Sequence, residues 1–174
     1  MTLYLYEIRS GAADRQEVAA ILERLAATFE SHGATVIESQ VTSGHDQVFT
    51  VVEVADGAAA PVISAADLGA RDVSEPAQVR LVGANLDDLK AAKPQAGYLV
   101  EWDIPAEIDM DTYLARKKAN GPKYADVPEV DFLRTYVRED TEKCLCFYDA
   151  PDEEAVTRAR AAVNTPISRL FELG

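Results

Sequence analysis

The pattern of apolar and polar positions changes its period along the chain, and each change predicts an element. Residues 3–9 are rich in aromatic and branched side chains, which predicts a strand. Over residues 14–31 apolar side chains recur at intervals of three and four positions, which predicts a helix. Residues 34–42 and 47–54 are extended in character, and the polar residues 43–46 between them predict the turn of an antiparallel hairpin.

The rest of the first half predicts a second helix and a closing strand. A helical pattern over residues 56–68 is interrupted by Pro61, and residues 78–82 read as a short strand. The predicted order is therefore βαββαβ, that of a ferredoxin-like unit, in which a four-stranded antiparallel sheet carries two helices on one face. Residues 83–94 contain a short helical pattern and are interpreted as a connection.

The same pattern returns when the chain is shifted by 96 positions. Leu3 falls on Leu99, and residues 36–56 fall without a gap on residues 132–152. The second copy has its own helices and last strand, predicted over residues 110–118, 151–163 and 167–173.

This repeat predicts an α+β fold of tandem ferredoxin-like repeats. The domains are residues 1–94, which include the connection, and residues 95–174. Two such units in one chain can cover each other's bare sheet face. We therefore expect an intrachain pseudo-dimer, packed sheet to sheet like the subunits of a dimeric α/β barrel.

Composition and charge narrow the classes of partner. The chain has 30 Asp and Glu against 17 Lys and Arg, a formal net charge of −13, which disfavours nucleic acid and anionic lipid. No apolar run approaches the roughly 20 residues that cross a membrane. The amino terminus has no features of a secretion signal, so we expect a cytoplasmic protein. Cys144 and Cys146 are expected to be free thiols, because residues i and i+2 of a strand are poorly placed for a disulfide.

The second half resembles a known bacterial family over three segments, residues 98–101, 132–140 and 143–156. The last segment is the most specific, since it carries Cys146, Tyr148 and an Ala-Pro turn into an acidic helix. The family consists of small ferredoxin-like domains of unknown function and includes a nickel-binding protein. The resemblance implies the fold of the second half. No histidine follows His45, so we predict no nickel site and no cofactor.

Strand alternation sorts the side chains of the second half onto two faces. We expect Leu133, Thr135, Val137, Leu145 and Phe147 to pack on the helices. The other face is expected to carry Leu99, Glu101, Asp103, Phe132, Arg134, Tyr136, Cys144, Cys146 and Tyr148. The corresponding face of the first half is expected to carry Leu5, Glu7, Val36, Glu38, Gln40, Val48, Thr50 and Val52. These assignments predict a ligand pocket between the two sheets, formed by Glu101, Arg134, Tyr136, Cys146, Tyr148 and Glu38.

Several of these residues have an alternative, structural interpretation. Arg134 and Glu101 could form a buried ion pair that fixes the register and binds nothing. The two cysteines could bind a soft metal, or could be small apolar core residues. Asp109 could cap a helix rather than bind a metal with Asp111. The basic run at residues 116–118 is interpreted as the solvent-exposed side of its helix.

The sequence supports three functions, in this order. The first is a binding module for a small molecule or a metal. The second is a cofactor-independent enzyme of the dimeric α/β barrel class, an isomerase, cyclase or monooxygenase, with Glu101 or Tyr148 as general acid or base. The third is a structural or regulatory partner protein. Whether the chain is an enzyme and whether it forms a homo-oligomer are left open.

Overall fold

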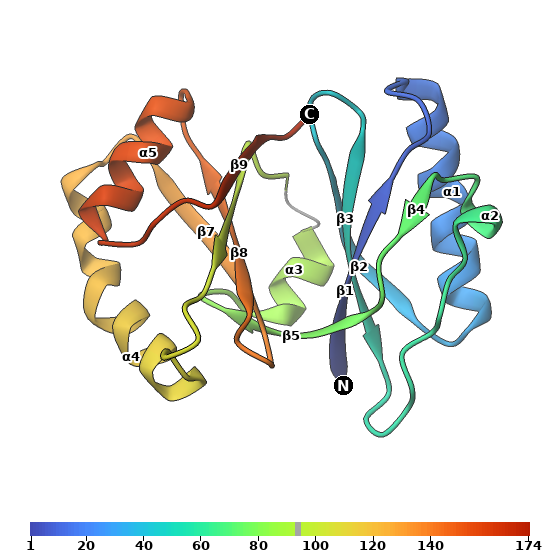
Figure 1. Ribbon diagram of the computed structural model, residues 1–174, viewed down its shortest axis with the longest axis horizontal. Coiled ribbons are helices and arrows are strands. Elements are labelled where there is room, and N and C mark those ends of the chain that lie inside the picture. The colour runs from blue at the N-terminus through green and yellow to red at the C-terminus, as the bar shows by residue number, and fades with distance from the viewer. Residues whose placement is uncertain (93–94) are drawn as a thin grey trace. The chain divides into compact units, whose positions relative to one another are not determined.

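The computed structural model describes residues 1–92 and 95–174 and shows two compact α+β units (Figure 1). The first unit comprises Met1–Val79, Leu89–Pro94 and Gly174, and the second comprises Arg80–Asp88 and Gln95–Leu173. The predicted boundaries at 1–94 and 95–174 stay a prediction. Within the described part of the chain, no helix combines the length and the apolar character needed to cross a membrane.

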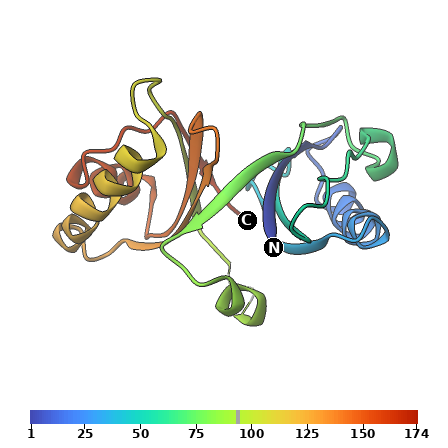
Figure 2. The ribbon, with the colours of Figure 1, turned by 90° about the horizontal axis from the view of Figure 1, so that it is seen from below.

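The first unit has a sheet in which β1 (Thr2–Arg9) lies beside β3 (Gln47–Val54), and β2 (Thr35–Val41) pairs with the far edge of β3. The short strand β4 (Asp72–Val73) and β5 (Ala77–Val82) both pair with β1. Helix α1 (Arg15–Ser31) covers one face of this sheet, as Figure 2 shows. Its buried residues, Val18, Ile21, Leu25 and Phe29, are the apolar positions of the predicted helical pattern.

The second predicted helix of the first unit is much shorter than the pattern over residues 56–68 indicated. Only one turn forms, α2 (Ala65–Leu68), and the Ser64 side chain caps it. Proline has no backbone N–H and disfavours the helical conformation of the residue before it, so Pro61 prevents an earlier start. Gly57, with φ of 80°, places a turn further upstream. The connection contains helix α3 (Leu86–Ala92), in agreement with its helical pattern.

The second unit follows the predicted order. Its sheet runs β7 (Asp131–Arg138), β8 (Lys143–Asp149), β6 (Tyr98–Asp103) and β9 (Arg169–Glu172). Helices α4 (Met110–Asn120) and α5 (Glu153–Ala162) cover one face (Figure 1). Asp109 and Asp152 cap them, which confirms the capping interpretation of Asp109. From Gly121 the chain tightens into a 3₁₀ helix, η1 (Gly121–Asp126), so α4 is shorter than α1.

The repeat predicted at a shift of 96 positions is present in the backbone. A β-bulge lies between Val36 and Glu38 in the first unit and between Phe132 and Arg134 in the second. Each hairpin turn also contains one non-glycine residue in the left-handed region, His45 and Thr141, both with φ of 56°. Bulges and left-handed turn residues are local irregularities. Their recurrence at the same offset shows that both units fold the same way.

The predicted face assignment is wrong for the second strand of each hairpin. Val137 pairs with Cys144 and Thr135 with Cys146, and cross-strand partners share a face of the sheet. Cys144, Cys146 and Tyr148 therefore belong to the helix-side core, together with Phe132, which the bulge turns to that side. Leu145 and Phe147 lie on the opposite face, which is called the open face because neither α4 nor α5 covers it, although both side chains are buried. The first unit has the same correction: Val48, Thr50 and Val52 lie on the side of α1, and so does Val36.

Candidate functional site

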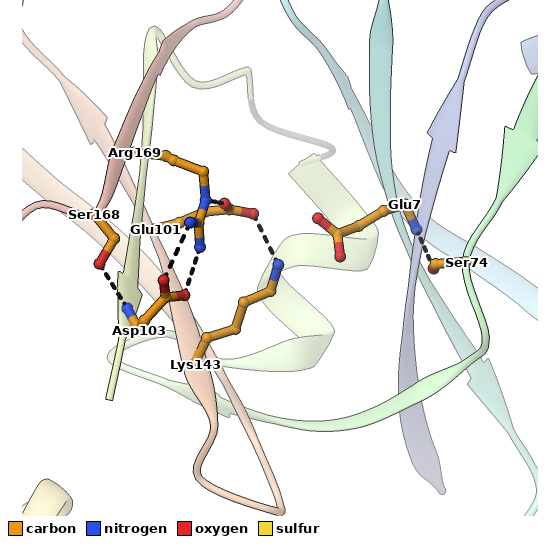
Figure 3. A network of polar contacts seen from close by, with 7 residues as sticks. All are labelled: Glu7, Ser74, Glu101, Asp103, Lys143, Ser168 and Arg169. Atoms are coloured by element: carbon orange, nitrogen blue, oxygen red, sulfur yellow. Dashed lines mark hydrogen bonds and ion pairs between the residues drawn. The ribbon is translucent and has the colours of Figure 1, made fainter. Parts of the chain in front are cut away.

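The open face of the second sheet carries a network of ion pairs around Glu101, which is 2% exposed (Figure 3). One carboxylate oxygen accepts a hydrogen bond from Lys143 Nζ at 3.0 Å, and the other accepts from Arg169 Nε. Arg169 also binds Asp103, with Nη1 at 3.1 Å from its carboxylate. Both oxygens of Glu101 are therefore held by cations. This arrangement suits a residue that ties β6, β8 and β9 together better than a general acid or base.

Arg134 and Tyr136 lie on the same open face, as predicted, and both are fully buried. The Arg134 guanidinium lies over the Phe147 ring, 4.9 Å from its centroid, and Tyr136 packs edge-on against the same ring. The alternative of an Arg134–Glu101 ion pair is wrong, because β8 separates their strands and Glu101 pairs with Lys143 and Arg169.

Glu38 lies on the open face of the first sheet, where its carboxylate accepts a hydrogen bond from Gln40 Nε2 at 3.0 Å. The six predicted site residues thus do not form one group. Glu101, Arg134 and Tyr136 share the open face of the second unit, whereas Cys146 and Tyr148 lie on its helix side. A ligand role for the open-face residues stays a prediction.

A cavity of about 30 Å³ lies on the helix side of the second unit, with walls from β6, β8, α4, η1 and α5. Both cysteines line it. They are free and buried, as predicted, with their sulfur atoms 4.0 Å apart. Cys146 Sγ also accepts hydrogen bonds from Thr135 Oγ1 at 3.1 Å and from Arg160 Nη1 at 3.5 Å. Cys146 is therefore surrounded by polar donors, unlike an apolar core residue.

Arg160 is the charged centre of this cavity and is only 2% exposed. Its Nη1 donates to Tyr148 Oη at 3.0 Å, and its Nη2 donates to the Pro166 carbonyl at 2.8 Å. The Tyr148 hydroxyl also shares a hydrogen bond of 2.6 Å with Tyr124. The Tyr148 hydroxyl thus links Arg160 on α5 to Tyr124 on η1.

One polar atom of a cavity-lining residue, Arg160 Nε, is buried without a hydrogen-bond partner among the described residues, and the buried Tyr113 hydroxyl has only the weakly accepting Cys144 thiol beside it. A buried donor without a partner costs about 1–3 kcal/mol, so such atoms mark places where a ligand or water would bind. Sequence reasoning missed both residues. The sequence contained one signal for Arg160. It lies four positions after Val156 and three before Val163, on the apolar side of α5, where a charged residue is unusual.

The basic run at residues 116–118 is only partly solvent-exposed, which corrects the prediction. Arg116 and Lys117 line the cavity and are half-buried, whereas Lys118 is exposed. The Arg116 guanidinium lies over the Trp102 ring at 5.4 Å, and Lys117 Nζ lies over the Phe132 ring at 4.5 Å. Aromatic rings hold cations in this way, so two positive charges are fixed at the cavity.

The surroundings separate the acidities of the two thiols. The hydrogen bond from Cys144 lowers the pKa of the Cys146 thiol well below its ordinary value, and Lys117, Arg160 and Thr135 act in the same direction against burial. The same bond raises the pKa of Cys144, which keeps its proton. Burial raises the pKa of Tyr124 to about 12 and raises that of Tyr148 well above its ordinary value, so both phenols stay neutral.

The donor set does not fit a nickel ion. Over residues 1–92 and 95–174, no group of three or more His, Cys, Asp or Glu side chains could hold a metal. The cysteine pair supplies two sulfur atoms, and Arg116, Lys117 and Arg160 line the same cavity. A divalent cation needs about four ligands and would be repelled by these charges. His32 bonds the Thr28 carbonyl of its own helix, and His45 lies in a hairpin turn of the first unit.

Comparison with solved structures supports the predicted fold class over the whole chain. The chain is similar to a "putative monooxygenase" from Lactobacillus acidophilus NCFM, with 12% identity and a TM-score of 0.53, over 99% of this chain and 92% of that one. It is also similar to "Putative Chlorite dismutase TA0507", with 14% identity and a TM-score of 0.55, over 100% of this chain and 95% of that one. The α+β fold of the dimeric α/β barrel class is confirmed.

No curated protein matches the chain. The family comparison matches one region, and that region is the one in which the sequence resembled a known family. It includes β6, both helices of the second unit, its hairpin and β9. Residues 98–173 match the family described as "Nickel responsive protein SCO4226-like", which confirms the resemblance for the second unit.

Proposed function

We propose that the chain is a small-molecule-binding protein whose ligand is a small anion held in the helix-side cavity of the second unit. The observation that carries this proposal is the charge of the cavity wall. Arg116, Lys117 and Arg160 line it, and no Asp or Glu does, in a chain with a net charge of −13. A thiolate at Cys146 balances one of the three cations, which leaves a positive surplus in an otherwise acidic protein.

The unfilled donors support a ligand with oxygen acceptors. Arg160 Nε is buried and has no partner among the described residues, and the buried Tyr113 hydroxyl has only the weakly accepting Cys144 thiol beside it, so both can donate to an anionic oxygen. Charge-assisted hydrogen bonds to a guanidinium are about twice as strong as neutral ones. A carboxylate or another small oxyanion would therefore satisfy both groups at once.

The cavity volume limits the size of the group that enters. A volume of about 30 Å³ compares with the roughly 10–15 Å³ that one water needs. Only the charged head of a ligand fits, and the rest of a larger molecule would lie at the opening. We therefore expect binding of small carboxylates or oxyanions in preference to aromatic or lipidic compounds.

The enzyme alternative receives less support. It rests on a fold shared with a protein named as a monooxygenase, and at 12% identity that similarity carries the fold alone. Glu101, one of the two acid–base residues predicted for it, has both carboxylate oxygens in ion pairs.

The single tryptophan offers a direct test, because Trp102 lines the cavity. We expect titration with acetate, formate or phosphate to change its fluorescence in a saturable way. Lys117→Gln should weaken binding about tenfold, the effect of losing roughly 1.4 kcal/mol. Lys118→Gln is the matched control, since Lys118 is adjacent but exposed and should bind as the wild type does.

A second pair of variants tests the centre of the cavity. Arg160→Gln should abolish saturable binding, whereas Arg158→Gln, two positions earlier on α5 and paired with Glu129 at the surface, should leave it unchanged. Failure of all three anions to saturate the fluorescence change would contradict the proposal, and so would equal weakening in Lys117→Gln and Lys118→Gln.

A further inference from the structure

The sulfur atom of Cys146 has an unusual set of neighbours for a buried cysteine. Thr135, Arg160 and Cys144 all lie within hydrogen-bonding distance of it, at 3.1, 3.5 and 4.0 Å. A neutral thiol is a weak acceptor and gains little from three donors, whereas a thiolate gains much. The geometry therefore favours the ionised form, and the lowered pKa of Cys146 agrees with it.

The equivalent position in the first unit shows what this backbone site needs for packing alone. It is Thr50, which is fully buried and shares a hydrogen bond with Ser39 at 3.0 Å. Among the described residues, Thr50 has no hydrogen bond to an arginine or lysine. The cations around Cys146 are thus additional to what the fold requires.

The cavity brings a small oxidant to this sulfur atom. Cys146 lines it, and so do Arg160, whose Nε has no partner among the described residues, and Tyr113, whose hydroxyl has only the Cys144 thiol beside it. A nucleophilic thiolate beside free donors is the arrangement needed to polarise an O–O bond and to stabilise the oxygen that leaves. A volume of about 30 Å³ admits hydrogen peroxide and excludes bulky disulfide reagents.

We propose that Cys146 is a nucleophilic cysteine that hydrogen peroxide oxidises to a sulfenic acid, and that Cys144 does not convert this product to a disulfide. In this step the Cys146 thiolate donates an electron pair to one peroxide oxygen, the S–O bond forms and the O–O bond breaks. The other oxygen leaves as hydroxide and takes a proton from water. Sulfur is oxidised by two electrons, and peroxide is reduced by two. The reaction goes beyond the proposed anion binding and does not require it.

The sheet prevents a disulfide between Cys146 and Cys144 from forming after the oxidation. Residues i and i+2 of a strand are about 6.5 Å apart, near the upper limit for a disulfide, and the sulfur atoms would have to approach to about 2.05 Å. Strand β8 is paired on both sides at these positions. Cys144 lies opposite Val137 and Trp102, and Cys146 lies opposite Thr135 and Val100. The backbone therefore cannot bend to bring the two sulfur atoms together.

The test treats the folded chain with hydrogen peroxide, removes the peroxide and records the intact mass. The chain is then unfolded in urea with excess dimedone, which traps sulfenic acids but is too bulky for the cavity, and the modified residue is identified. We expect one dimedone adduct on Cys146 in the wild type and in Cys144→Ser. Cys146→Ser should show none. A larger thiol reagent should react with the native chain at least tenfold more slowly than with the urea-unfolded chain.

The pH dependence of the adduct rate distinguishes a stabilised thiolate from an ordinary thiol. The titratable and charged groups that face Cys146 are Cys144 and Tyr148 on β8, Tyr113 and Lys117 on α4, Tyr124 on η1 and Arg160 on α5. Because the Cys146 pKa is lowered, the rate should stay flat below pH 8.5, where an ordinary thiol loses about tenfold per pH unit. Lys117→Gln should raise the midpoint by on the order of one unit, and Lys118→Gln should not move it.

Each outcome decides the proposal. Three results would overturn the proposal that Cys146 is the nucleophile. They are an adduct on Cys144, no adduct after peroxide treatment of the folded wild type, and an adduct rate that falls tenfold per pH unit as the pH is lowered from 8.5. An intact mass lower by two hydrogen atoms, without an adduct, would show a disulfide between Cys144 and Cys146. That result would overturn the proposal that Cys144 does not react with the sulfenic acid. The Lys117 and Lys118 variants keep the test valid if Cys146→Ser fails to fold. Anion titration by Trp102 fluorescence is a separate measurement, so failure of one proposal is distinguishable from failure of the other.

Discussion

The two units have the same backbone on the helix side of their hairpins, and the side chains of the second hairpin strand differ there. Val48, Thr50 and Val52 of β3 correspond to Cys144, Cys146 and Tyr148 of β8, at a shift of 96 positions. The first set packs in an apolar core against α1. Of the second set, Cys144 and Cys146 line a cavity together with the buried Arg160, and Tyr148 accepts a hydrogen bond from that arginine.

The helices explain why the space between sheet and helices is filled in the first unit and contains a cavity in the second. Helix α1 has 17 residues and buries four apolar side chains against the first sheet. Helix α4 has 11 residues, buries Tyr113, and gives way to a 3₁₀ helix at Gly121 and Pro122. The shorter helix covers less of the sheet, and two of its side chains at the cavity are the cations Arg116 and Lys117. A repeat can therefore keep its backbone while one copy has a cavity at a position that the other copy fills.

The largest expected effect comes from emptying the filled core. Phe29 is fully buried on α1 and packs edge-on against Tyr6, with ring centroids 4.8 Å apart. Phe29→Ala should lower the free energy of unfolding by about 3–5 kcal/mol, measured by urea unfolding with circular dichroism, because the cavity cannot collapse around it. Val62→Ala is the control, since Val62 is 75% exposed and should change the free energy by less than about 0.5 kcal/mol.

Tyr124→Ala sharpens the same comparison in the second unit. Tyr124 is half-buried at the cavity, where it stacks on Phe132. Its truncation should cost clearly less than that of Phe29, because the site is already open. A loss in Tyr124→Ala that equals the loss in Phe29→Ala would show that both units are equally close-packed.

The repeat and the element order could be predicted because they depend on local patterns. Apolar spacing located α1, and a gapless alignment of two hairpins predicted the same register for both. Pro61 was recognised as an interruption, but its effect was underestimated. One proline removes a hydrogen bond and restricts its neighbour, and no long apolar face in residues 56–64 compensated for that cost.

The site could be predicted only in part, because strand alternation alone does not state which face meets the helices. Val137 was assigned to the helices and Cys144 to the open face, although the turn at residues 139–142 makes them partners. Partner residues share a face, so this single constraint would have moved Cys146 and Tyr148 to the helix side. The bulge that moves Phe132 has no comparable signal in the sequence.

An intermediate effect is expected from the same chemical change in each unit. The Tyr6 hydroxyl donates to the Pro61 carbonyl at 2.5 Å, whereas the buried Tyr113 hydroxyl has only the weakly accepting Cys144 thiol beside it. Tyr6→Phe should cost about 1–3 kcal/mol, since it leaves a buried carbonyl unpaired. Tyr113→Phe should be neutral or stabilising in urea unfolding. A clear loss of stability in Tyr113→Phe would mean that its hydroxyl has a permanent partner, such as a bound water.

The smallest expected effect tests the two hairpin turns, which the units share most closely. His45 and Thr141 both have φ of 56°, a conformation that glycine adopts without strain and that a β-branched side chain disfavours. Thr141→Gly should therefore stabilise the chain by about 0.5–1 kcal/mol, and His45→Gly should stabilise it less, because histidine tolerates this region better. Thr141→Ala, which removes the branch but keeps Cβ, should fall between the wild type and Thr141→Gly in urea unfolding. If His45→Gly gives the larger gain, contacts outside the turn, such as the hydrogen bond of 2.8 Å from Ser10 Oγ to the His45 carbonyl, determine the stability of the first hairpin, and the two turns are equivalent in backbone only.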